Sequence, residues 1–437
     1  MLQTRILRAL PRCFLWLSWA VWALPLSWNV LEGATPRTSQ LANPSNRKTV
    51  SKAPARAKRP AARNTNSKAV SQSRAMAPNA GVHKALVSVA GRTRRVVVRR
   101  AAYRSAYSPF IRSGPWREPT FADSSDGDIV DGEDPVVRRA AVEALGPFNG
   151  AVVVVDPFTG RILSLVNQKL ALKGGFQPCS TIKVVAALAA LSEGIIDKST
   201  TFPSVGRRMD LTEALAVSNN PYFAVLGERL GFERVSYYAR LFGLGEKAGL
   251  NIAGEQPGLL PLEPPPSGVG MMTSFGSGIT LTPLQLAALI STIANGGTLY
   301  YLQHPETKEE VERFVPRVKR RLDIRPWIAD LLPGLSGAVE WGTARRAGVN
   351  HSELIFGKTG TCTDERSPTH LGWFGSFNDA GRNKLVVVVL LTGGGSVNGP
   401  VASGIAGAVY RNLSSQNYFA QARYLSPNSL LAAEVYR

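Results

Sequence analysis

Strand-like runs lie at both ends of the folded part of this chain, and helical runs lie between them. The first, GAVVVVDPFTGRILSLVN (150–167), is two apolar stretches around a turn with Asp, Pro and Gly, the pattern of a β-hairpin. Three more come late, at ELIFGKTGT (353–361), LGWFGSF (371–377) and KLVVVVLL (384–391). Strands at both ends with helices between them predict an α+β fold built on an antiparallel sheet.

Helical patterns fill the residues between these strands. They lie at 180–193, over 210–295 with a proline- and glycine-rich break at 257–270, near 325–346, and at about 400–413. So much helix between the strands predicts a mostly helical subdomain, with the remaining helices flanking the sheet.

The positive charge of the chain is concentrated near its N-terminus. Residues 1–117 hold 22 of the 51 Lys and Arg and one acidic residue, Glu32, whereas 118–437 hold 29 basic and 30 acidic residues. Residues 32–117 begin with a stretch rich in Ala, Pro, Ser, Asn, Lys and Arg that has few large apolar side chains. We expect a basic, low-complexity and largely disordered linker there, and a folded domain over 118–437.

An apolar run follows three arginines at the N-terminus. The arginines lie in residues 1–12 and precede about 18 mostly apolar residues within 13–31, close to the roughly 20 that span a bilayer. We interpret 13–31 as a signal-anchor transmembrane helix behind a cytoplasmic N-terminus, with a cleaved signal peptide as the alternative. The linker would then lie outside the cytosol, so we expect no nucleic-acid partner.

The helical run at 180–193 has a lysine in its otherwise apolar first turns. Ser180 and Lys183 are three residues apart, so on a helix they share a face, with Cβ atoms about 5–6 Å apart. The helix N-terminus, desolvation by Val and Ala, and any second cation would each lower the lysine pKa. Such a lysine can take the proton of a neighbouring hydroxyl and make it a nucleophile. By itself the signal is weak, since S-x-x-K recurs at 45–48.

A second motif is Ser218-Asn219-Asn220, which interrupts two apolar helical stretches. Its Ser and Asn side chains would be displayed at the wall of a cleft. A turn or a helix cap is the alternative interpretation, because S-x-N recurs at several other places in the chain.

The third motif is Lys358-Thr359-Gly360-Thr361, on a predicted strand. A phosphate-binding loop would need a glycine where the chain has Ser352, and a helix after the motif, so we exclude that interpretation. On a strand, Gly360 would let a ligand backbone approach closely. Lys358 and the two threonines would be placed to hold a carboxylate.

The order of the three motifs is more specific than any one of them. S-x-x-K, S-x-N and K-T-G, in this order, are the set found in penicillin-binding proteins and class A β-lactamases. Over about 135–413 the chain resembles a penicillin-binding transpeptidase domain, most closely the membrane-anchored class B type. The hairpin, SFGSGITLTPLQLAALISTIANGG (274–297) and GTARRAG (342–348) are similar to that family as well.

The resemblance implies a D,D-transpeptidase that cross-links peptidoglycan. Ser180 would attack the carbonyl between the two terminal D-alanines of a stem peptide, with Lys183 as its base. Ser218 and Lys358 would relay the proton to the leaving D-alanine. An amine from a second stem peptide would then resolve the acyl-enzyme, whereas penicillins would stay attached.

The resemblance also implies how the substrate is bound. Asn220 would hold the substrate amide, and Thr359 and Thr361, on either side of Gly360, would bind the terminal carboxylate. The backbone N–H groups of Ser180 and Thr361 would form the oxyanion hole. No metal and no cofactor are expected.

Cellular placement follows from the same resemblance. We expect a single-pass protein of the bacterial inner membrane with a periplasmic catalytic domain, and a membrane glycosyltransferase as a candidate partner. The linker stands where class B enzymes have an N-terminal pedestal domain, and the link from the hairpin to Ser180 is shorter than in relatives.

Two cysteines should lie near the site. Cys179 replaces the glycine usual before the nucleophile, and Cys362 directly follows K-T-G-T. They would form a disulfide if their Cα atoms came within about 7 Å. Two unpaired small residues are the other interpretation, and the one we favour.

Two other classes of function fit the same scaffold. A D,D-carboxypeptidase or a β-lactamase would use water as the acyl acceptor, although the E-x-x-L-N segment of class A β-lactamases is not found. A non-catalytic β-lactam sensor or structural division component would carry a vestigial site, which the complete motif set argues against.

Overall fold

The structure is a computed structural model, and the residues it describes are 116–204, 206–349 and 353–420. The predicted cytoplasmic segment 1–12, the signal anchor 13–31 and nearly all of the linker 32–117 lie outside them and stay predictions. Among the described residues, no helix is long and apolar enough to cross a membrane.

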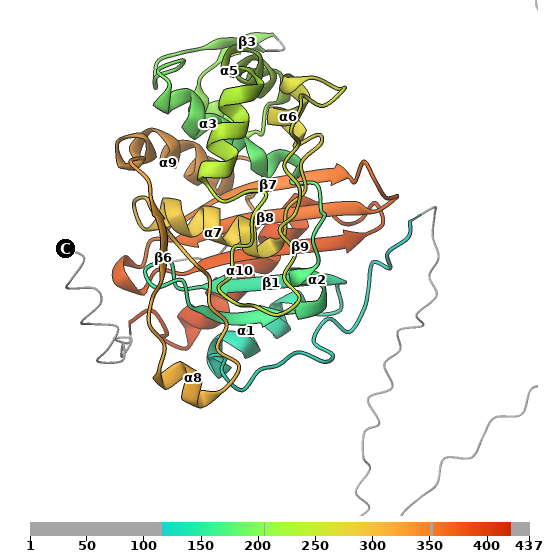
Figure 1. Ribbon diagram of the computed structural model, residues 1–437, viewed down its shortest axis with the longest axis vertical. Helices are drawn as coiled ribbons and strands as arrows, with labels where there is room; N and C mark the ends of the chain where they lie inside the picture. Colours follow the sequence, from blue (N-terminus) through green and yellow to red (C-terminus); the bar gives the residue numbers. More distant parts are fainter. Residues whose placement is uncertain (1–115, 205, 350–352, 421–437) are drawn as a thin grey trace, which may run out of the picture. The chain divides into compact units, whose positions relative to one another are not determined.

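A five-stranded antiparallel sheet joins the two ends of the domain (Figure 1). Its strands are β1 (Gly150–Val155), β2 (Ile162–Val166), β7 (Ile355–Thr363), β8 (His370–Asn378) and β9 (Val386–Gly393). Their order is β2-β1-β9-β8-β7, so the early hairpin pairs with the last strand and β7 forms an edge. The predicted α+β class with an antiparallel sheet is confirmed.

Both faces of this sheet are buried, which explains the unbroken apolar runs of β1 and β9. Alternate residues of β1 enter two different cores: Val153 and Val155 join one, and Val152 and Val154 join the other. The covering helices are α1 (Pro135–Leu145) and α10 (Gly399–Ser415) on one face and α7 (Pro283–Ala294) on the other (Figure 1).

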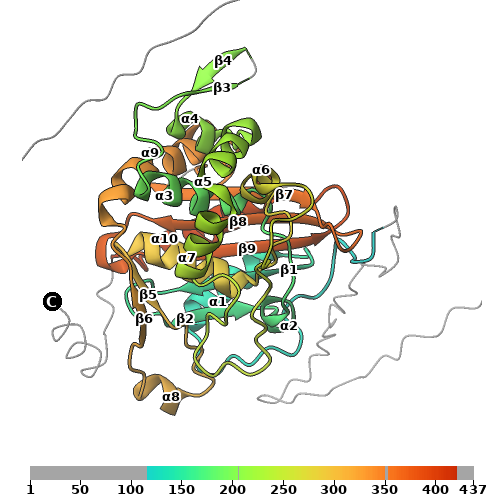
Figure 2. The same ribbon diagram turned by 45° about the horizontal axis from the view of Figure 1, so that its top comes forward.

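A mostly helical subdomain packs at the β7 edge of the sheet (Figures 1 and 2). Its elements are the 3₁₀ turn η1 (Cys179–Ile182), α3 (Lys183–Ser192), α4 (Leu211–Ala216), α5 (Asn220–Leu241), α6 (Val269–Phe275) and α9 (Arg325–Glu340). η1 and α9 contact β7, while α3 packs on α5 and α4 packs on α9. The subdomain predicted between the strands is thus present, and it brings η1 and α3 beside the K-T-G strand.

The remaining helices and strands of the described residues are short. They are α2 (Gln168–Leu172), the two-stranded sheet of β3 (Phe202–Ser204) and β4 (Arg207–Met209), the two-stranded sheet of β5 (Thr298–Tyr300) and β6 (Val318–Arg321), α8 (Lys308–Glu312) and η2 (Gly381–Asn383).

Two predicted helical stretches are longer than the observed helices. Within 210–295 the chain leaves helix after Leu241, where Gly243 has φ 89°, and becomes helical again only at Val269. The stretch near 325–346 ends at Glu340. Gly342 just beyond it lies so close to α4 that an added Cβ would come 2.2 Å from the carbonyl oxygen of Ala216.

Gly372 of β8 packs against the backbone that leads into α10. A Cβ at this position would lie 2.5 Å from the carbonyl oxygen of Asn398 and 2.8 Å from its nitrogen. We expect Gly372→Ala to lower the free energy of unfolding by about 1–3 kcal/mol, because the strand or the helix start must shift. Urea denaturation measures this. Gly395→Ala is the matched control, since nothing lies within 4 Å of its added methyl group. An equal loss in both variants would contradict the explanation.

Candidate active site

Ser180 lies on the turn η1, immediately before α3 begins at Lys183. The amide and the hydroxyl of Thr181 both donate to the carbonyl oxygen of Pro178, at 3.2 and 2.7 Å, and close the turn. We call residues 178–182 the Ser180 turn. The helix predicted from residue 180 therefore starts with a 3₁₀ turn, and α3 behind it is buried from Lys183 to Leu191.

The amine of Lys183 is the centre of the site. Its Nζ lies 2.7 Å from Ser180 Oγ, 2.5 Å from Asn220 Oδ1 and 3.1 Å from Ser218 Oγ, with the Ser218 carbonyl oxygen at 3.0 Å. Lys183 is 0% exposed and Ser180 is 8% exposed. The structure thus brings S-x-x-K and S-x-N together around one buried nitrogen.

Ser218 and Asn220 reach the lysine from the junction of α4 and α5. Ser218 has φ 59°, in the left-handed region, where the chain turns from one helix to the next. Asn219 accepts a hydrogen bond from the Tyr222 amide and caps α5, whose first residue is Asn220. The cap interpretation of this motif therefore applies to Asn219, and its two neighbours face Lys183.

Lys358 supplies a second buried cation. It is 0% exposed, and its Nζ donates to the carbonyl oxygen of Thr359 at 3.0 Å. Burial lowers the pKa of Lys358 to about 7. Burial also lowers the pKa of Lys183 well below its ordinary value, and the charge of Lys358 lowers it further. Within the described part of the chain, the Ser218 hydroxyl is hydrogen-bonded to Lys183, and no hydrogen bond joins it to Lys358.

Thr343 is a site residue that the three motifs do not include. Its Oγ1 lies 2.6 Å from Thr359 Oγ1, and its amide donates to the carbonyl oxygen of Ala216 at 3.1 Å. It therefore links the K-T-G strand to the end of α4, two residues before Ser218. Its segment, GTARRAG, is similar to the transpeptidase family in sequence, but the sequence does not single out this hydroxyl.

The two residues that follow Thr359 are held by the protein itself. The Thr361 side chain, on an exposed residue, accepts a hydrogen bond from the Gly399 amide at 2.8 Å. A Cβ on Gly360 would lie 3.0 Å from the carbonyl oxygen of Pro178 and 3.2 Å from Thr181 Cγ2. A side chain at position 360 would therefore crowd the Ser180 turn, whereas the role of Gly360 in the approach of a ligand stays a prediction.

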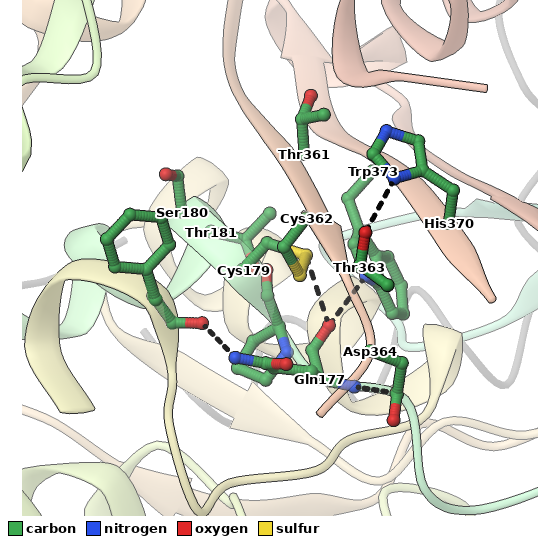
Figure 3. Close-up of a disulfide and its surroundings, with 12 residues drawn as sticks. Gln177, Cys179, Ser180, Thr181, Thr361, Cys362, Thr363, Asp364, His370 and Trp373 are labelled. Carbon is green, nitrogen blue, oxygen red and sulfur yellow. Dashed lines mark hydrogen bonds between the residues drawn. A yellow bond between two sulfur atoms is a disulfide. The ribbon is translucent and has the colours of Figure 1, made fainter. Parts of the chain in front are cut away.

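A disulfide joins Cys179 to Cys362 (Figure 3). Their Cα atoms are 5.6 Å apart, within the range that a disulfide spans. The favoured prediction of two unpaired cysteines is wrong. The pair is separated by 183 residues, and only the packing of η1 on β7 brings the two sulfurs together.

Gln177 is the other residue that sequence reasoning missed, since its sequence neighbourhood carries no motif. Its amide donates to Asp364 Oδ2 at 3.1 Å, and its Oε1 accepts from the Glu365 amide at 3.1 Å. Its carbonyl oxygen accepts from Trp373 Nε1 at 2.9 Å. These contacts, most of them drawn in Figure 3, fix the chain before the Ser180 turn to the β7–β8 connection.

Comparisons with known proteins agree with this geometry. A family model described as the penicillin binding protein transpeptidase domain matches residues 150–414. Stage V sporulation protein D of Bacillus subtilis is 31% identical over 310 residues, which cover 62% of this chain and 48% of that protein. Peptidoglycan D,D-transpeptidase PbpA of Mycolicibacterium smegmatis is 27% identical over 352 residues, covering 63% and 69%.

Two further similar proteins are a peptidoglycan D,D-transpeptidase and a chain of known structure. Peptidoglycan D,D-transpeptidase FtsI of Escherichia coli is 25% identical over 317 residues, covering 61% of this chain and 52% of FtsI. The chain thus spans about half the length of FtsI and of the sporulation protein. A chain solved in a study of polymerization and crosslinking by a peptidoglycan synthase complex shares the fold, with a TM-score of 0.51 and 24% identity, covering 66% and 62%.

The buried Lys358 predicts a specific pH dependence of stability. Its folded pKa is about 7, whereas an unfolded lysine titrates near 10.4. Between these values the unfolded chain binds more protons, so stability rises with pH, by at most about 1.4 kcal/mol per pH unit for one group. We expect Lys358→Met to flatten this rise between pH 7 and about 9.5, as measured by urea denaturation.

The control is a lysine on the surface. Lys198 is exposed, so Lys198→Met tests for the general effect of losing one lysine. If both variants kept the slope of the wild-type protein, burial of Lys358 would not be the source of the pH dependence.

Proposed function

The chain belongs to the penicillin-binding protein transpeptidase family, and we propose that it is a peptidoglycan D,D-transpeptidase that works through an acyl-enzyme on Ser180. The observation that carries the proposal is the 2.7 Å contact between the Ser180 hydroxyl and the buried amine of Lys183. Relatives named as D,D-transpeptidases support the reaction class.

Lys183 would act as the general base. A neutral amine has two N–H bonds and one lone pair. If the N–H bonds go to Asn220 Oδ1 and to the Ser218 carbonyl oxygen, at 2.5 and 3.0 Å, the lone pair faces Ser180 Oγ. Burial supports this role, because it disfavours the ammonium form that could not accept a proton.

Acylation then proceeds by exchange of one bond for another. Ser180 Oγ gives its proton to Lys183 and forms a bond to the carbonyl carbon of the penultimate D-alanine. The C–N bond to the terminal D-alanine breaks, and its nitrogen takes up a proton. Ser218 Oγ, 3.1 Å from Lys183 Nζ, is placed to carry that proton. Lys358 would contribute through its charge, since its own hydrogen bond goes to Thr359.

Substrate binding is assigned to residues around the same cleft. With Asn220 Oδ1 turned to Lys183, its Nδ2 is left for the substrate amide. Thr359 and Thr361 would hold the terminal carboxylate. The N–H groups of Ser180 and Thr361 would stabilise the tetrahedral oxyanion.

The second half-reaction would transfer the acyl group from Ser180 to an acceptor. An amine of a second stem peptide would attack the ester carbonyl, form the cross-link and release Ser180, whereas a penicillin would leave a stable ester.

We place the domain in the periplasm, tethered through the apolar run 13–31. A membrane glycosyltransferase is a candidate partner, in keeping with the coupling of polymerization and crosslinking named for the structural neighbour.

A fluorescent penicillin tests the acyl-enzyme. We expect the full-length protein to form a stable adduct on Ser180 that is absent from Ser180→Ala. Mass spectrometry of the labelled peptide locates the adduct. Rapid release of hydrolysed drug would point to a β-lactamase. No adduct at all would refute the acyl-enzyme.

Donor and acceptor stem peptides then separate the remaining activities. A cross-linked dimer is the expected product. Release of D-alanine without a dimer would identify a carboxypeptidase, and labelling without any peptide reaction would identify a sensor.

Thr343→Val should weaken binding of the substrate carboxylate. The change removes the hydroxyl that lies 2.6 Å from Thr359 Oγ1, so the Thr359 hydroxyl loses its fixed orientation. We expect the penicillin concentration for half-maximal acylation rate to rise about tenfold, the scale of one net hydrogen bond. The limiting rate should change less. Thr343→Ser keeps the hydroxyl and is the matched control, and equal effects in both variants would contradict this role.

A further inference from the structure

We propose that the Cys179–Cys362 disulfide is a positioning element that holds the Ser180 amide in its catalytic orientation. The inference rests on the proposed function, since it concerns how the oxyanion hole is assembled. It assigns the pair a task in the reaction beyond stabilising the fold.

The first observation is where the disulfide lies. Cys179 directly precedes Ser180, and Cys362 directly follows Thr361. The covalent bond therefore flanks both backbone N–H groups that would bind the oxyanion. The bond joins the Ser180 turn to β7 at a Cα–Cα separation of 5.6 Å (Figure 3). Gly360 of the same strand also packs closely against this turn, at Pro178.

The second observation is the backbone of Cys179. Its φ is 50°, in the left-handed region that favours glycine. A residue with a Cβ prefers to leave this region, and a change of φ at 179 swings the peptide that carries the Ser180 N–H. A glycine at position 179 would adopt this conformation without this cost. In this chain the bond to Cys362 opposes the relaxation.

The third observation is that both ends of the segment around Cys179 are held by other contacts. Gln177, two residues before Cys179, is held by Asp364 and Trp373. Lys183, four residues after it, is held by Asn220 and Ser218. Breaking the disulfide therefore releases a short segment between two fixed points. We expect a misaligned Ser180 amide within a domain that stays folded.

The sulfur pair can be reduced without unfolding the domain. Cys179 is buried, but Cys362 is partly exposed on the strand. A thiolate of an external dithiol attacks the Cys362 sulfur, forms a mixed disulfide with it and releases Cys179 as a thiolate, which takes up a proton. The second thiol of the reductant then displaces Cys362, so that both cysteines are thiols and the reductant has become a disulfide. The disulfide thus makes the acylation rate depend on an external thiol.

The experiment compares acylation rates in matched variants of the full-length protein. All carry Cys13→Ser, which leaves Cys179 and Cys362 as the two remaining cysteines of the parent. The parent therefore has no free thiol when oxidised and two when reduced. Cys179→Ala/Cys362→Ala removes the bond and keeps a Cβ at position 179. Cys179→Gly/Cys362→Ala removes the bond and also the preference against positive φ.

The expected result is a difference between alanine and glycine at position 179. The limiting rate of acylation by a fluorescent penicillin should fall about 5- to 30-fold in the alanine variant and in the reduced parent, the factor that corresponds to one residue held in the left-handed region. The glycine variant should recover most of the rate and be insensitive to reductant. Each rate is referred to the fraction of protein that the fluorescent penicillin labels after a long incubation, so that unfolded protein does not lower the rate.

Two outcomes would overturn the inference while leaving the proposed function intact. One is that all forms acylate at the same rate. The other is that the glycine variant is as slow as the alanine variant, which would mean that the bond acts by general stabilisation. Absence of acylation in the oxidised parent would refute the proposed function itself.

Discussion

The burial of one amine beside one hydroxyl is the constraint on which this domain depends. A charged lysine with no exposure costs several kcal/mol unless it is paired or neutral, and Lys183 has no carboxylate among its hydrogen-bond partners. The rings of Phe223 and Phe275 lie 5.6 and 5.9 Å from Nζ, and Lys183 is fully buried. α5 and α6, which carry these rings, thus form part of the buried environment that disfavours the charged amine.

The sheet contributes its edge. β7 has a neighbouring strand on one side only, so its other side can face the Ser180 turn. The close approach at Gly360, the disulfide at Cys362 and the contacts of Gln177 tie this edge to the turn by three kinds of interaction. An interior strand, paired on both sides, could not present the K-T-G backbone in this way.

Features that depend on local sequence patterns could be predicted, whereas features that depend on contacts between distant segments could not. The strands at both ends, the helical middle and the three motifs follow from periodicity and from short spacings, and the structure brings Ser180, Lys183, Ser218 and Asn220 together. Thr343, Gln177 and the cysteine pairing depend on contacts between distant segments. No short spacing encodes these contacts. The packing of Gly360 against the Ser180 turn is a contact of the same kind, since that turn lies about 180 residues earlier in the chain.

The site holds two buried lysines. Burial lowers the pKa of both, and the charge of Lys358 lowers the pKa of Lys183 further, so the doubly charged state is disfavoured. On the proposed mechanism, the proton that leaves Ser180 arrives on Lys183 while Lys358 is nearby. Any charge on Lys358 then makes that proton easier to pass on to the leaving nitrogen. Lys358 would thus promote proton transfer without a hydrogen bond to Ser218, which is consistent with its contact to Thr359.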